Sequence, residues 1–242
     1  MTIERAGFPG GVTTEQVTLF LAQLAVVAEF TVVVFALLAI GGVFSASIAR
    51  ARTLAVQTIA PAALGLAFAV ACVSMAGSLY LSDVAHFVPC RLCWYQRIAM
   101  YPLVPVLGIA AIRRDTNVRI YGIALAGIGA VISTYHVLLE RFPSLESGVC
   151  DPNNPCTLIW VERFDYLTIP TMALSGFAAI VVLLVVAGRH EPTCVPAPAA
   201  EEPTWPSKPR NQSEFTPVTT PDVEPSTSTP ERSGSGAASS RS

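Results

Sequence analysis

The chain has 242 residues, of which 52% are hydrophobic and only 13% are charged, and its formal net charge is −2 at pH 7. Because soluble globular domains carry about 25% charged residues, this composition argues against a water-soluble fold. The net charge itself says little about partners, and we expect no nucleic-acid partner.

Five segments are long and apolar enough to cross a bilayer, since a spanning helix needs about 20 mostly apolar residues. In chain order they are residues 18–40 (with an extension to 48), 57–80, 94–112, 120–139 and 168–187. They predict an all-α fold, a polytopic membrane helical bundle. A soluble core of this size has no need of five such runs.

Basic residues predict the orientation of this bundle. Two arginines stand in the predicted loop 49–56 and three in the predicted loop 113–119. By the positive-inside rule these loops face the cytoplasm. The loops 81–93 and 140–167 then face outside, as does the short N-terminal segment 1–16.

The first apolar segment predicts an extra transmembrane helix over 17–48. It is too long for a secretion signal and has no positively charged leader, so we expect it to remain in the chain. Glu29 lies inside it. An ionisable group at that depth has a polar partner or a function, unless it is protonated and packed against the bundle.

The first outer loop ends in Cys90 and Cys93, which two residues separate, where a helix is predicted to begin. The helix dipole and a nearby cation both lower the pKa of a thiol at such a position. Arg97 lies one turn deeper on the same face, and a charge inside a membrane needs a partner or a function. A thiolate at Cys93 beside a polar electron acceptor would provide both. The alternative is an arginine that extends to the nearby interface.

His136 lies near the outer end of the fourth segment, at a depth similar to that of Arg97. The two side chains could flank the head group of a quinone. In the alternative, which stays open at this point, His136 forms hydrogen bonds at the membrane interface.

The second outer loop contains Cys150 and Cys156 on either side of the turn-forming sequence Asp-Pro-Asn-Asn-Pro. A turn there brings the two cysteines together, so a disulfide between them is sterically reasonable. The apolar and charged residues over 157–167 favour either a short helix on the membrane surface or an extension of the next span.

The remaining cysteines are isolated, Cys72 inside a span and Cys194 in the C-terminal segment, which leaves two pairs on the outer side. Thiols outside the cytoplasm tend to be paired. The segment 190–242 is rich in proline, serine and threonine and has no hydrophobic period. This composition predicts a disordered cytoplasmic tail.

Two other functions for the outer cysteines stay open. Together they could bind zinc in a membrane scaffold, although two spans separate the pairs and the second pair is widely spaced for zinc. They could also form structural disulfides in a transporter or channel subunit, although a CxxC disulfide closes a very small loop and stabilises little. We predict a redox site with no metal.

The stretches PCRLCWYQRIAMYPL and TYHVLLERFPSLESGVCDPNNPC resemble the DsbB/BdbC disulfide-bond formation proteins. That family consists of four-helix membrane quinone reductases that reoxidise an extracytoplasmic thioredoxin-fold thiol oxidase. The resemblance covers about 57–187 and leaves out the extra helix and the tail. The order of the motifs, with CxxC first, separates it from the vitamin K epoxide reductase family, in which CxxC comes last.

The resemblance implies a role for each of the four outer cysteines. Cys150 takes the mixed disulfide with a DsbA-like oxidase, and Cys156 then exchanges with Cys90. Cys93, released as a thiolate, meets the quinone. The close spacing of Cys150 and Cys156 is that of the Gram-positive-like branch, which leaves the order of exchange between the loops open.

The resemblance also implies a cofactor and a place in the cell. Arg97 matches the family arginine that binds the quinone, and His136 matches a family histidine near it. The Gram-positive-like branch favours menaquinone over ubiquinone. The implied protein is a multi-pass thiol:quinone oxidoreductase of a bacterial plasma membrane, with its active cysteines on the extracytoplasmic side, that supports disulfide bond formation in exported proteins.

Overall fold

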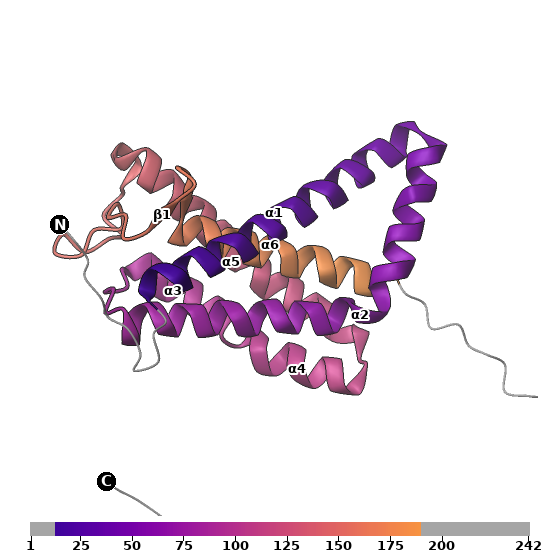
Figure 1. Cartoon of the computed structure of the whole chain (residues 1–242), viewed down its shortest axis with the longest axis horizontal. Helices are drawn as coiled ribbons and strands as arrows, with labels where there is room; N and C mark the ends of the chain where they lie inside the picture. The colour runs from indigo at the N-terminus through magenta and orange to yellow at the C-terminus, as the bar shows by residue number, and fades with distance from the viewer. Residues whose placement is uncertain (1–12, 190–242) are drawn as a thin grey trace, which may run out of the picture. The chain divides into compact units, whose positions relative to one another are not determined.

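The computed structural model describes residues 13–189, and within them the chain forms six α-helices and one two-stranded antiparallel sheet (Figure 1). The predictions for 190–242, Cys194 among them, and for residues 1–12 lie outside this range. The helices are α1 (Thr14–Phe44), α2 (Ala46–Leu79), α3 (Arg91–Met100), α4 (Leu103–Arg113), α5 (Arg119–Arg141) and α6 (Ile169–Ala187), and the strands are β1 (Glu162–Arg163) and β2 (Leu167–Thr168).

Five helical segments among the described residues are long and apolar enough to cross a membrane, which confirms the predicted all-α helical bundle. The third of them, Arg91–Arg113, contains both α3 and α4. The break lies at Tyr101-Pro102, because proline has no backbone N–H to continue the helical ladder. The helix break that Pro102 leads one to expect is therefore present, whereas Pro105 is accommodated near the start of α4.

The prediction of a loop over residues 49–56 is wrong, because these residues belong to α2. Ser45 alone separates α1 from α2, and its extended backbone (φ −140°, ψ 125°) makes the turn. Residues 46–57 contain no glycine or proline, and alanine, leucine and arginine all favour helix. Arg50 and Arg52 therefore lie within helix α2 and not in a loop.

The predicted helix over 157–167 is also wrong, both as a surface helix and as an extension of the last span. β1 and β2 pair there instead, with Glu162 opposite Thr168. Phe164 (φ 52°) and Asp165 (φ 62°) have left-handed backbones, which close a tight hairpin and cannot occur within an α-helix. The apolar residues that suggested a helix face do not form one continuous face, and each makes its own contact. Trp160, for example, stacks on Phe87 with ring centroids 5.2 Å apart.

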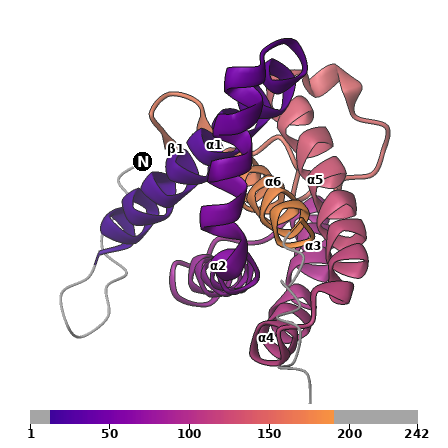
Figure 2. The same cartoon turned by 90° about the vertical axis from the view of Figure 1, so that its right-hand side faces the viewer.

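Helix α6 lies beside α1, α2 and α5, and Figure 2 shows it between α2 and α5. Close packing of α5 on α6 depends on Gly129, where a Cβ atom would come within 2.3 Å of the Phe177 ring. Both cysteine loops lie at one end of the bundle, together with the start of α1. Two contacts show this: Asn154 bonds the Pro89 carbonyl, and Arg163 pairs with Glu15 at 3.5 Å.

Candidate functional site

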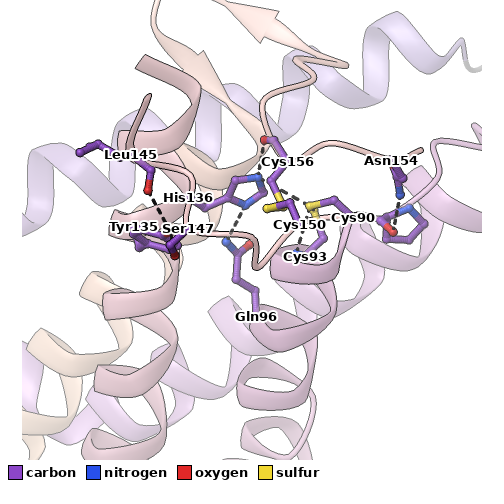
Figure 3. The surroundings of a disulfide bond; sticks show 11 residues. Cys90, Cys93, Gln96, Tyr135, His136, Leu145, Ser147, Cys150, Asn154 and Cys156 are labelled. Carbon is purple, nitrogen blue, oxygen red and sulfur yellow. Dashed lines mark hydrogen bonds between the residues drawn. A yellow bond between two sulfur atoms is a disulfide. The ribbon is translucent and has the colours of Figure 1, made fainter. Parts of the chain in front are cut away.

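The CxxC motif lies at the N-terminus of α3, as predicted (Figure 3). Cys90 is the N-cap residue, and its Sγ accepts a hydrogen bond from the backbone N–H of Cys93 at 3.4 Å. The two sulfurs lie 3.1 Å apart and share a hydrogen bond. The helix N-terminus thus stabilises negative charge on Cys90 more directly than on any later residue of the motif.

The second pair, Cys150 and Cys156, forms a disulfide with a Cα–Cα distance of 5.8 Å. The turn between them is held by the Asp151 carboxylate, which accepts a hydrogen bond from the Asn153 N–H at 2.9 Å. The Asn154 side chain donates to the Pro89 carbonyl at 3.1 Å and so ties this loop to the residue before the CxxC motif.

The two cysteine pairs meet in one buried cluster, in which Leu92 and Leu139 also pack. Figure 3 shows the disulfide alongside the thiol of Cys90. Cys156 is fully buried, while Cys90 and Cys150 are each 6% exposed. A reduced pair and an oxidised pair therefore lie in contact within one apolar environment, which is the arrangement that thiol–disulfide exchange needs.

His136 of α5 joins the two cysteine pairs from the side and is itself buried. Its Nε2 lies 3.0 Å from the Cys156 carbonyl oxygen and 3.7 Å from the Cys90 sulfur. Its Nδ1 lies 3.1 Å from the amide nitrogen of Gln96, which donates, so the ring proton belongs on Nε2. His136 thus presents an N–H to the Cys156 carbonyl and to the Cys90 sulfur.

The pKa of Cys90 lies far below the usual value for a thiol, at about 4. The largest cause is the hydrogen bond with the Cys93 thiol. Burial opposes the shift, and His136 adds to it through a hydrogen bond. This shift favours Cys90 as the thiolate of the reduced pair. The predicted thiolate at Cys93, released when Cys156 exchanges with Cys90, stays a prediction.

Replacing Cys93 with alanine is expected to raise the pKa of Cys90, because the thiolate loses its strongest hydrogen bond. Cys93→Ser is the matched control, since a serine hydroxyl still donates. The measurement is the rate of alkylation at Cys90 against pH, in protein that lacks Cys72 and Cys194. Alkylation follows the thiolate, so it should persist down to about pH 4 with Cys93 present and decline at higher pH in the alanine variant. Identical profiles in the two variants would contradict this assignment.

A large apolar cavity of about 460 Å³ opens on the other side of Cys93, between α1, α2, α3 and α6. Three of its polar lining residues, Cys93, Gln96 and Arg97, belong to α3. The Arg97 guanidinium donates to the Ser78 carbonyl at 2.9 Å and lies over the Trp94 ring, 5.1 Å from the centroid. The prediction that Arg97 shares a face with Cys93, one turn deeper, is consistent with this shared cavity.

The structure separates His136 from Arg97. His136 lines a small pocket of about 20 Å³ with Cys90, Cys93 and Glu140, and it is not among the residues that line the large cavity. Its predicted contact with a quinone stays a prediction, while its contacts with the cysteines are direct. Cys93 lines both spaces, as do Trp160 and Ile169, and it brings a thiol to their boundary.

Three further residues that support the site were not predicted: Gln96, Ser78 and Asn154. Gln96 carries a signal that could have found it, because a polar side chain one turn after Cys93 in an apolar span needs a partner. Asn154 was recognised as a turn former only. Ser78 acts through its backbone carbonyl, which no side-chain pattern could indicate.

The same groups include a possible metal site. The ligand atoms of Cys90, Cys93 and His136 lie within 4.8 Å of one another. Zinc in structural sites takes four ligands. Cys150 and Cys156 are bonded to each other, so the interpretation in which both cysteine pairs bind one zinc ion does not fit this structure.

Comparison with known sequences gives the family. The sequence model described as "Disulfide bond formation protein DsbB" matches residues 60–187, more than half of the chain. "Disulfide bond formation protein C" of Bacillus subtilis is 45% identical over 117 residues, which cover 48% of this chain and 84% of that protein. "Probable disulfide formation protein" of Oceanobacillus iheyensis is 42% identical over 120 residues, covering 49% and 83%.

No solved structure matches the chain significantly. The matched region begins within α2 and includes both cysteine pairs, Arg97 and His136, whereas α1 precedes it. The five apolar helices and the buried thiol cluster agree with a multi-pass membrane protein that performs disulfide chemistry. The chain therefore belongs to the DsbB family of disulfide bond formation proteins.

Proposed function

We propose that this disulfide oxidoreductase transfers electrons from an extracytoplasmic, DsbA-like thioredoxin-fold oxidase to a membrane quinone. The observation that carries the proposal is the position of Cys93, which lines both the pocket beside the thiol cluster and the large apolar cavity. A thiol at that boundary can take part in disulfide exchange on one side and reduce a membrane-soluble acceptor on the other.

The electron transfer proceeds in three balanced exchanges. The partner dithiol reduces the Cys150–Cys156 disulfide and becomes a disulfide itself. The Cys150/Cys156 dithiol then reduces a Cys90–Cys93 disulfide. The resulting Cys90/Cys93 dithiol returns to the disulfide and gives up two electrons and two protons. The last acceptor is the quinone, which takes both electrons and both protons to become a quinol.

The residues of the large cavity fit a quinone. An aromatic head group needs a polar end with hydrogen-bond donors, which Arg97 and Gln96 supply, and an aliphatic tail needs apolar walls. Arg97 keeps its charge at any relevant pH and can stabilise negative charge that develops on a head-group oxygen. Menaquinone remains our choice over ubiquinone, on the resemblance to the Gram-positive-like branch.

The contacts of His136 support a role in the exchange between the two pairs. An N–H beside the Cys90 sulfur stabilises the thiolate that attacks or leaves during disulfide exchange. Its second contact, to the Cys156 carbonyl, fixes the position of the loop pair against that sulfur. We place the cysteine end on the extracytoplasmic face of a bacterial plasma membrane, because Arg113 ends α4 and Arg114 caps it at the far end of this span.

The experiment is quinone reduction by the purified protein with a reduced thioredoxin-fold dithiol protein as electron donor. We expect the quinone absorbance to fall for wild type and to stay constant for Cys93→Ser and Cys150→Ser. Menaquinone and ubiquinone analogues are compared in parallel. If folded protein with free outer thiols reduces neither, the proposal is wrong. Stoichiometric zinc would then favour a metal scaffold at Cys90, Cys93 and His136, and cysteines that stay oxidised would favour structural disulfides.

A further inference from the structure

One wall of the large cavity lies outside the region that matches the DsbB family. Helix α1 ends before residue 60, where the match begins. Six of its residues nevertheless line the cavity, and all but one follow the i, i+3, i+4, i+7 and i+10 spacing of one helix face. These residues are Leu21, Leu24, Ala25, Val27, Ala28 and Thr31.

This face of α1 is closely packed against the family core. Ala22 and Ala25 are buried and contact Leu167 of β2 and Met172 of α6. On the other side a Cβ atom at Gly77 of α2 would come within 2.9 Å of the Leu21 side chain. Small residues at such contacts let helices approach closely in a membrane. The described buried residues of α1 all fall in its first half, which is the half that lines the cavity.

Polar contacts hold α1 in this position. The Glu29 carboxylate accepts hydrogen bonds from the hydroxyls of Tyr166, at 2.9 Å, and Ser175, at 2.8 Å. Nearer the helix start, Arg163 donates to the Thr18 hydroxyl at 2.9 Å. An ionisable side chain within a span is costly without partners, so these bonds fix which face of α1 is turned to the core. Tyr166 and Ser175 are thus the polar partners of Glu29, which the sequence alone did not identify.

The chemistry of the α1 wall differs from that of the α3 residues that line the same cavity. Cys93, Gln96 and Arg97 supply polar atoms from α3. The cavity-facing residues of α1 are aliphatic apart from Thr31, whose hydroxyl already donates to the Val27 carbonyl at 2.8 Å. Such a wall offers contact area and no further hydrogen-bond donor. It suits an aliphatic chain and not a polar head group.

We infer that α1 is a wall of the quinone site and that its cavity-facing side chains determine how the isoprenoid tail is accommodated. The inference rests on the proposed function, because it takes the ligand of this cavity to be a quinone with its head group at Arg97. It adds a specificity determinant that lies outside the family core.

Ala28→Phe tests the inference, because a phenyl ring at this half-buried position occupies part of the cavity. Ala36→Phe is the matched control, since Ala36 lies about two turns further along α1, is exposed and does not line the cavity. The measurement is the KM for a long-tailed and a short-tailed quinone in full-length protein. We expect Ala28→Phe to raise the KM for the long-tailed quinone by at least about tenfold, the scale on which an apolar pocket discriminates, and the KM for the short-tailed quinone less. Ala36→Phe should leave both values unchanged.

A second measurement needs no substitution and guards against a variant that fails to fold. Wild-type protein is irradiated with a quinone that carries a photoreactive group in its tail, and the labelled peptides are identified. Label on residues 21–31 supports the inference. If wild type reduces quinone but shows no label there and Ala28→Phe has unchanged KM values, α1 is not a wall of the site and the proposed function stands. If wild type reduces no quinone, the proposed function and the inference both fall.

Discussion

Replacing Cys90 with serine is expected to lower quinone-dependent turnover by at least about a thousandfold, the scale on which loss of an essential nucleophile acts. Cys90 is the sulfur at which the two pairs meet, because it packs with the Cys150–Cys156 disulfide and lies 3.1 Å from the Cys93 sulfur. A serine hydroxyl cannot form a disulfide, so electrons from the loop pair lose their route to Cys93. The measurement is the loss of quinone absorbance with a reduced thioredoxin-fold protein as donor.

Cys72→Ser is the matched control for this variant. Cys72 is a half-buried free thiol of α2 that lines neither the large cavity nor the small pocket, so its loss should leave turnover unchanged. The Cys90→Ser protein should still oxidise about one equivalent of the donor in a single turnover, because its Cys150–Cys156 disulfide is intact. Sustained turnover without Cys90 would show that the loop pair exchanges directly with Cys93 and would contradict the assigned order.

Features that depend on neighbours in sequence could be predicted here. A CxxC followed by apolar residues predicts a helix that begins around Cys93, and the structure begins it at Arg91. Helix periodicity then puts Arg97 on the face of Cys93. The turn formers between Cys150 and Cys156 predict their disulfide for the same local reason. In each case the interacting residues are only a few positions apart in the sequence, so the local backbone conformation decides the distance between them.

Features that depend on tertiary packing could not be predicted. The bond between Gln96 and His136 joins α3 to α5, and the bonds of Glu29 join α1 to Tyr166 and Ser175, which are far away in the sequence. Which helices lie side by side is not encoded in the period of any one of them. The helix prediction for 157–167, where the structure has a hairpin, was wrong for a related reason. Its apolar residues contact several different elements, and a helix-period count mistook them for one continuous face.

Replacing Arg97 with alanine is expected to lower kcat/KM for the quinone by about 10- to 100-fold, the cost of losing one charge-assisted hydrogen bond of about 1.5–3 kcal/mol. Arg97 supplies the cation at the polar end of the large cavity, beside Cys93. Its own contacts, to the Ser78 carbonyl and the Trp94 ring, position the guanidinium without neutralising it. The effect should appear chiefly as a raised KM for the quinone.

The exchange between the partner and the loop pair provides the internal reference for this variant. It takes place at Cys150–Cys156, away from the cavity, so a single-turnover oxidation of the donor in the absence of quinone should be unchanged. Arg91→Ala is the matched control, because Arg91 is an exposed arginine of the same helix that does not line the cavity. Arg97→Lys should be intermediate, since it keeps the charge and loses the planar fork and the stacking on Trp94. An equal loss in the quinone step and in donor oxidation would mean that Arg97 supports the fold of α3 and does not act on the acceptor.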